Sequence, residues 1–185
     1  MATLASVLSI SQDEVPAVII PGKEPLSISH HKLRQQVELF QQELSQLGIP
    51  PGVAVSLCLP NSLEFIVAFL GVALHRAIAA PLNPAYKEAE IDDYVTDLGS
   101  KAIIISKGNF EKEADVVRVA EKHEITVFEC HWNGEDVVLD VKRTGSLYRE
   151  EHAQIEEAGE EDVALVLHTS GTTGRPKAVS TVQLW

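Results

Sequence analysis

The sequence predicts an α/β fold with a mainly parallel sheet and helices on both of its faces. Short apolar runs rich in β-branched residues recur along the chain, and longer stretches with apolar residues at every third or fourth position separate them. Strands that alternate with helices in this way pair in parallel and are covered on both faces. The content of 45% hydrophobic and 23% charged residues is ordinary for a globular protein.

A β-hairpin and a long helix are the first expected elements. An apolar run at residues 15–20 is closed by Pro21 and Gly22, and a second run follows at residues 26–28. Ser29 is the expected N-cap of the helix, which ends before Gly48. One face of this helix should be buried, because apolar residues recur at helical spacing. They are Leu33, Val37, Phe40, Leu44 and Leu47.

The remaining elements are expected to alternate regularly. Strands are predicted at residues 53–57, 77–82, 102–105 and 125–128, and helices at residues 61–75, 87–98 and 111–123. Residues 137–141 are a candidate for a further strand between two Gly-containing turns. The apolar run at residues 163–167 predicts a last buried strand.

The charge argues against a nucleic-acid partner. Twenty-seven acidic and 15 basic residues give a formal net charge of −12, whereas duplex binding depends on Lys and Arg that neutralise phosphates. The acidic residues are densest at 150–162, which we expect to be a solvated connection. No apolar run approaches the roughly 20 residues of a membrane-spanning helix.

Cysteine and histidine give no sign of a metal or disulfide site. Cys58 and Cys130 lie far apart and are expected to be small core residues in a reducing compartment, since no secretory leader precedes them. The seven histidines show no spacing typical of metal ligands, so no metal site is predicted.

The strongest functional signal directly follows the strand at residues 163–167. Glycines allow close backbone approach, successive N–H groups can form an anion-binding nest, and hydroxyls add donors. A nearby lysine supplies a flexible point charge. The candidate phosphate-binding residues are Thr169, Ser170, Gly171, Thr172, Thr173, Gly174 and Lys177. The alternative is an ordinary polar turn, but the length and order of the pattern favour a phosphate-binding loop beyond the carboxyl end of a strand.

This loop does not follow the Walker A pattern, because Arg175 and Pro176 separate the last Gly from Lys177 and no Ser or Thr follows the Lys. The order T-S-G-T-T-G-R-P-K instead resembles the signature loop of the adenylate-forming superfamily, which includes acyl-CoA synthetases and luciferases. Residues 60–65 (P-N-S-L-E-F) and 81–86 (P-L-N-P-A-Y) are similar to further segments of that family.

The resemblance implies an ATP-dependent acid–CoA ligase. In this family the loop holds the β- and γ-phosphates of ATP while a carboxylate attacks the α-phosphate. The products are an acyl-adenylate and pyrophosphate, and the thiol of CoA then forms a thioester. It implies a catalytic role for Lys177 and the use of ATP, Mg²⁺ and CoA by the full-length parent.

Three positions are similar to the oxalate–CoA ligase branch of the family. Arg76 stands where the commoner pattern has Gly, His168 precedes the loop, and Gln183 follows it where relatives usually have His. Oxalate is therefore the expected acid. A parent resembling 4-coumarate–CoA or fatty acid–CoA ligases is the alternative.

The resemblance also implies that residues 1–185 are the N-terminal part of the AMP-binding domain, truncated just after the loop. Such a fragment is expected to be inactive alone, in the cytoplasm or the peroxisome. Strand 163–167 would lack its neighbours, and its exposed edge could associate with other copies of the chain. A non-catalytic nucleotide-binding or interaction module is the alternative function.

Overall fold

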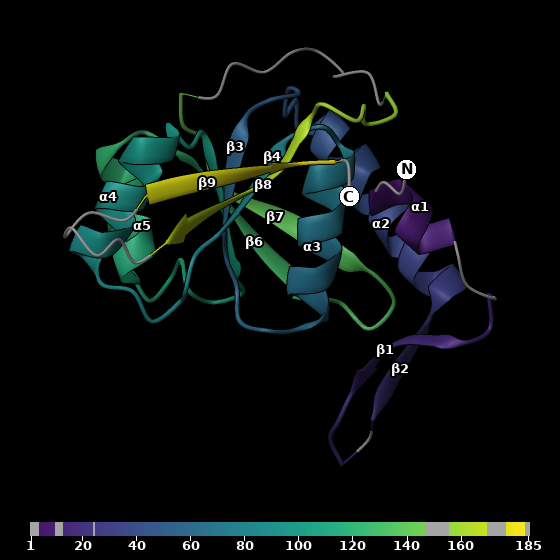
Figure 1. Ribbon diagram of the computed structural model, residues 1–185. Coiled ribbons are helices and arrows are strands. Elements are labelled where there is room, and N and C mark those ends of the chain that lie inside the picture. The colour runs from purple at the N-terminus through teal and green to yellow at the C-terminus, as the bar shows by residue number, and fades with distance from the viewer. Residues whose placement is uncertain (1–3, 10–12, 24, 147–155, 170–176, 184–185) are drawn as a thin grey trace.

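A seven-stranded sheet forms the centre of the molecule (Figure 1). The computed structural model describes residues 4–9, 13–23, 25–146, 156–169 and 177–183. The strands are β1 (Pro16–Ile20), β2 (Leu26–Ser29), β3 (Ala54–Cys58), β4 (Ile78–Pro81), β5 (Ala102–Ser106), β6 (Thr126–Trp132), β7 (Val137–Arg143), β8 (Val163–Thr169) and β9 (Lys177–Val182). The helices are α1 (Leu4–Ser9), α2 (His30–Gln46), α3 (Leu63–Leu74), α4 (Glu88–Leu98) and α5 (Asp115–Lys122).

The sheet is parallel at its centre and antiparallel at both edges. Its strand order is β7-β6-β5-β3-β4-β8-β9. β3 pairs in parallel with β4 and β5, β5 with β6, and β4 with β8, whereas β7 and β9 pair antiparallel to their neighbours. The predicted α/β class with a mainly parallel sheet is confirmed.

Helices cover both faces of the sheet, because apolar side chains of β5 point alternately to one face and to the other. Ile104 packs in a cluster with residues of α2 and α3, whereas Ile103 and Ile105 pack in a second cluster with residues of α4 and α5. All three isoleucines are fully buried. Successive side chains of a strand point to opposite faces, so one apolar run supplies two cores.

The predicted helix start at Ser29 is confirmed, and Ser62 is the N-cap of α3. The Ser29 hydroxyl accepts a hydrogen bond from the Lys32 N–H at 3.2 Å, and the Ser62 hydroxyl accepts one from the Phe65 N–H at 3.3 Å. Side-chain oxygens at these positions satisfy N–H groups that lack an intrahelical partner. The predicted N-terminal hairpin is present as β1 and β2, which project away from the sheet (Figure 1).

Three expectations are corrected. Helix α5 begins at Asp115 rather than at residue 111, because Glu113 takes a φ of 50° and interrupts a right-handed helix. Helix α1 was not expected. Residues 163–167 do not form a free edge, since β8 lies between β4 and β9 and the outer strand is β9.

Within the described residues, no helix is long and apolar enough to cross a membrane. Cys58 and Cys130 are buried in the core, at 3% and 2% exposure, as the sequence predicts.

Candidate phosphate-binding site

The end of β8 lies at the edge of the sheet where ligands bind in parallel α/β folds. β8 runs parallel to β4, with Leu165 opposite Ala79. The carboxyl ends of β3, β4, β5, β6 and β8 therefore meet at one edge, which is the usual ligand-binding edge. The expectation that residues 163–167 are a strand leading to this edge is confirmed.

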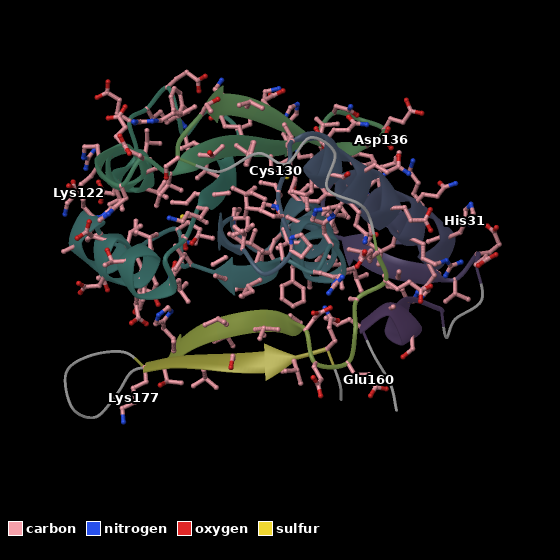
Figure 2. The ribbon with its side chains drawn as sticks, turned by 90° about the horizontal axis from the view of Figure 1, so that it is seen from above. His31, Lys122, Cys130, Asp136, Glu160 and Lys177 are labelled. Carbon is pink, nitrogen blue, oxygen red and sulfur yellow. The ribbon has the colours of Figure 1, made fainter. Side chains whose placement is uncertain are left out.

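Thr169 and Lys177 face each other where the candidate loop leaves the sheet. They are paired residues of the antiparallel β8–β9 hairpin, and the Thr169 hydroxyl donates a hydrogen bond to the Lys177 carbonyl oxygen at 3.4 Å. Both residues are exposed. Figure 2 shows Lys177 at the beginning of β9, on the outer side of the molecule. The other five candidate residues, Ser170, Gly171, Thr172, Thr173 and Gly174, lie outside the described residues.

The Lys177 ammonium group has no ion-pair partner among the described residues. Its positive charge is thus not neutralised by any carboxylate in that part of the chain. An exposed lysine next to a hydroxyl donor fits a phosphate group, which offers several acceptor oxygens and negative charge.

His168, the residue before Thr169, packs against helix α4. Its side chain is only 6% exposed, and its Nε2 lies 3.0 Å from Oδ2 of Asp97. Its ring lies on Tyr94, with ring centroids 4.5 Å apart and planes at 45°. In the sequence, His168 is only a mark of one branch of the family. No local pattern shows this contact, because Asp97 precedes His168 by 71 residues.

Tyr94 links this contact to the segment that follows β4. The rings of Tyr86 and Tyr94 lie 5.2 Å apart, so Tyr86 packs on Tyr94. The Asn83 side-chain oxygen accepts the Ala85 N–H at 2.9 Å and shapes the turn before Tyr86. Burial and the hydrogen bond with Tyr86 raise the pKa of Tyr94, so its phenol is neutral at pH 7.

The far end of the β8–β9 hairpin is held by Arg76. The Arg76 Nε donates to Oδ2 of Asp162 at 2.8 Å, and a second ion pair joins Arg76 to Glu156. Arg76 takes a φ of 64°, a left-handed conformation that favours Gly, which agrees with the Gly of the commoner family pattern. Asp162 and Glu156 are therefore ion-pair partners of Arg76, while most other described residues of the acidic connection are exposed, as expected for a solvated connection.

The pKa of Asp162 lies below its usual value. Burial alone would raise it, but the hydrogen bonds from Arg76 and from the Gly159 N–H outweigh burial and favour the carboxylate. Gln183, which follows β9, contacts α3 at the same end of the hairpin. Its buried side-chain amide donates a hydrogen bond to the Ala73 carbonyl oxygen at 2.7 Å. Gln183 is thus a packed structural residue in this fold.

Within the described residues, no group of three or more His, Cys, Asp or Glu side chains could hold a metal ion. We therefore assign Mg²⁺ to no described residue. Burial raises the pKa of the Cys58 thiol to about 11 and also raises that of Cys130. Neither thiol is suited to act as a nucleophile, because the thiolate is the reactive form.

A family model described as AMP-binding enzyme matches residues 11–183. The oxalate–CoA ligase of Arabidopsis thaliana is 36% identical over 188 residues, which cover 98% of this chain and 35% of that protein. The long-chain-fatty-acid–CoA ligase FadD13 of Mycobacterium tuberculosis is 35% identical over 136 residues, which cover 74% of this chain and 26% of that protein.

Among solved structures, ATP-bound MatB from Rhodopseudomonas palustris superposes with a TM-score of 0.72 at 25% sequence identity. The match covers 98% of this chain and 35% of that chain. Nearly the whole of this chain aligns with the Arabidopsis ligase and with MatB, but it spans only about a third of the length of each. The part that aligns includes the α/β sheet described above.

Proposed function

Because this chain belongs to the AMP-binding enzyme family of acid–CoA ligases, we propose that residues 169–177 bind the phosphate groups of ATP. The observation that carries the proposal is the pairing of Thr169 with Lys177 at the ligand-binding edge of the sheet. This pairing brings a hydroxyl and an ammonium group without an ion-pair partner among the described residues to the two ends of the Gly/Ser/Thr segment. Backbone N–H groups of that segment would supply the remaining donors.

In the parent reaction, these residues would hold the phosphates while a carboxylate attacks the α-phosphate. Lys177 would counter the negative charge that is transferred to the leaving pyrophosphate. No general base is required, because the substrate carboxylate is already an anion at neutral pH. The CoA thiol then attacks the acyl-adenylate, which forms the thioester and releases AMP. Mg²⁺, when bound, would neutralise phosphate charge.

We propose oxalate as the acid, by analogy with the Arabidopsis relative. Fatty-acid and 4-coumarate ligases among the relatives provide the alternative substrates. Residues 1–185 would be the N-terminal part of the adenylation domain, and the groups that select the acid would lie outside it. We place the protein in the cytoplasm or the peroxisome, as expected for its proposed parent.

A non-catalytic module is the second candidate, favoured by the exposed apolar side chains of β8 and β9. Leu167, Val179 and Val182 are 46%, 50% and 38% exposed. Together with the unpaired outer side of β9, they could join copies of the chain by edge-to-edge pairing. Concentration-dependent mass in sedimentation equilibrium would support self-association through this edge, and a constant monomer mass would exclude it.

The phosphate-binding proposal is tested by the affinity of the chain for ATP, measured by isothermal titration calorimetry. Lys177→Gln removes the charge and should weaken binding by about tenfold, a change that corresponds to about 1.4 kcal/mol. Lys101→Gln is the matched control, since Lys101 is exposed at the start of β5, at the opposite edge of the sheet. Equal affinity of the two variants would refute the role of Lys177.

A further inference from the structure

The end of β8 next to the candidate loop depends on few contacts with the rest of the protein. The parallel register with β4 is set by Leu165 and Ala79, four positions before Thr169. Beyond this point β8 pairs with β9, which is itself the outermost strand. The hairpin alone therefore does not fix where Thr169 and Lys177 lie relative to the sheet.

His168 supplies the missing contact with the body of the protein. Its ring lies against Tyr94, its Nε2 is 3.0 Å from the Asp97 carboxylate, and its side chain is 6% exposed. Tyr94 is in turn packed on Tyr86, so three rings connect β8 with α4 and with the segment after β4. The contact comes one residue before Thr169.

We propose that His168 is a positioning residue, which through Asp97 and Tyr94 fixes the end of β8 against α4 so that the loop is held ready for phosphate. This inference rests on the proposed function of the loop. The imidazole is packed toward α4 and has Asp97 as its polar partner, so it acts through the backbone of Thr169 rather than by contact with ATP. A pre-positioned loop binds more tightly because less conformational entropy is lost on binding.

The inference predicts that each part of the contact contributes to affinity for phosphate. His168→Phe keeps a ring on Tyr94 but loses the hydrogen bond, His168→Ala loses both, and Asp97→Asn weakens only the bond. Asp93→Asn is the matched control, because Asp93 is exposed on α4 one turn before Asp97 and makes the same change of charge.

Binding of ATP and of inorganic pyrophosphate is measured by calorimetry with the full chain, together with the melting temperature without ligand. We expect His168→Ala to weaken both ligands by about tenfold, with His168→Phe and Asp97→Asn in between and Asp93→Asn within about twofold of the wild type. We expect Asp97→Asn to leave the melting temperature nearly unchanged, since surface substitutions have small effects on stability.

The possible failures are distinct. If the wild-type chain binds neither ATP nor pyrophosphate, the proposed function fails and this inference fails with it. If the wild type binds and the His168 and Asp97 variants bind equally well, only the positioning role is refuted. A loss of affinity in Asp97→Asn that is matched by Asp93→Asn would also refute it, because general charge rather than the contact would then be responsible.

Discussion

Replacement of Gly71 by Ala should destabilise the protein, although Ala is the better helix former. Gly71 lies in the interior of α3, where that helix packs on Phe40 of α2. A Cβ at Gly71 would lie 2.5 Å from Cδ1 of Phe40, 3.1 Å from its Cγ and 3.2 Å from its Cβ. Rotation of the ring could relieve the first contact but not the last, because the Phe40 Cβ is fixed by the backbone of α2.

The magnitude follows from two opposing contributions to the free energy of unfolding. Overpacking in a dense core costs about 1–3 kcal/mol, and Phe40 is fully buried. Helix propensity favours Ala over Gly by about 0.8–1 kcal/mol. We therefore expect Gly71→Ala to lower stability by up to about 2 kcal/mol, which lowers the melting temperature of a domain of this size by up to about 8 °C.

Urea unfolding followed by circular dichroism measures this change. The control is the same substitution in a Phe40→Ala background, where Cδ1 and Cγ, the two nearest atoms of Phe40, are removed. In that background Gly71→Ala should cost less than in the wild type, because the two residues are in contact and their effects are not additive. Equal costs in both backgrounds, or a stabilising effect in the wild type, would refute the packing argument.

Three further predictions follow from buried and paired groups. Burial lowers the pKa of His75, whose neutral ring is hydrogen-bonded to the Ile49 carbonyl. The free energy of unfolding should therefore fall as the pH drops below about 6.5, the pKa of histidine in the unfolded chain, because the unfolded chain then binds the proton more readily. His75→Gln should remove this dependence in urea titrations between pH 7 and pH 5, and an unchanged slope would contradict it. The pKa of Asp162 is lower in the folded protein than in the unfolded chain, where it is about 3.9. The carboxylate therefore stabilises the fold at pH values above about 3.9, and this contribution is lost as the pH falls through the pKa of the folded state. Acid unfolding of Asp162→Asn should lack it, whereas an identical acid midpoint would argue against the Arg76–Asp162 pair. Cys58 and Cys130 should react with a thiol reagent at pH 8 only after unfolding, because they are buried and their pKa values are raised; rapid reaction of the native protein would disprove their burial.

The sequence predicted the sheet well because its strands are apolar runs buried on both faces. Ile103, Ile104 and Ile105 are such a run, and no helix pattern competes with it. Strand β9 was missed because its sequence, K-A-V-S-T-V, has neither a continuous apolar run nor a strict alternation of polar and apolar residues, and its partner, β8, lies across the loop. Exposed strands of this kind are defined by the neighbour with which they pair rather than by their own hydrophobicity.

The candidate site was predicted in part. The structure pairs Thr169 with Lys177 at the end of the β8–β9 hairpin, while the phosphate-binding roles of all seven candidate residues remain predictions. The contacts of His168 with Tyr94 and Asp97 could not be predicted, because they depend on how α4 packs beside β8. The ion pair of Arg76 with Asp162 was hidden for the same reason, since the two residues lie 86 positions apart.

Phosphate binding by residues 169–177 is tested most directly by ¹H–¹⁵N correlation spectra of the chain during titration with ATP. The proposed function predicts that the amide signals of Thr169, Lys177 and the residues between them shift first and most, and that Lys177→Gln reduces these shifts at equal ATP concentration. Signals that do not move, or shifts that gather away from the β8–β9 hairpin, would contradict the assignment of this loop as the phosphate site.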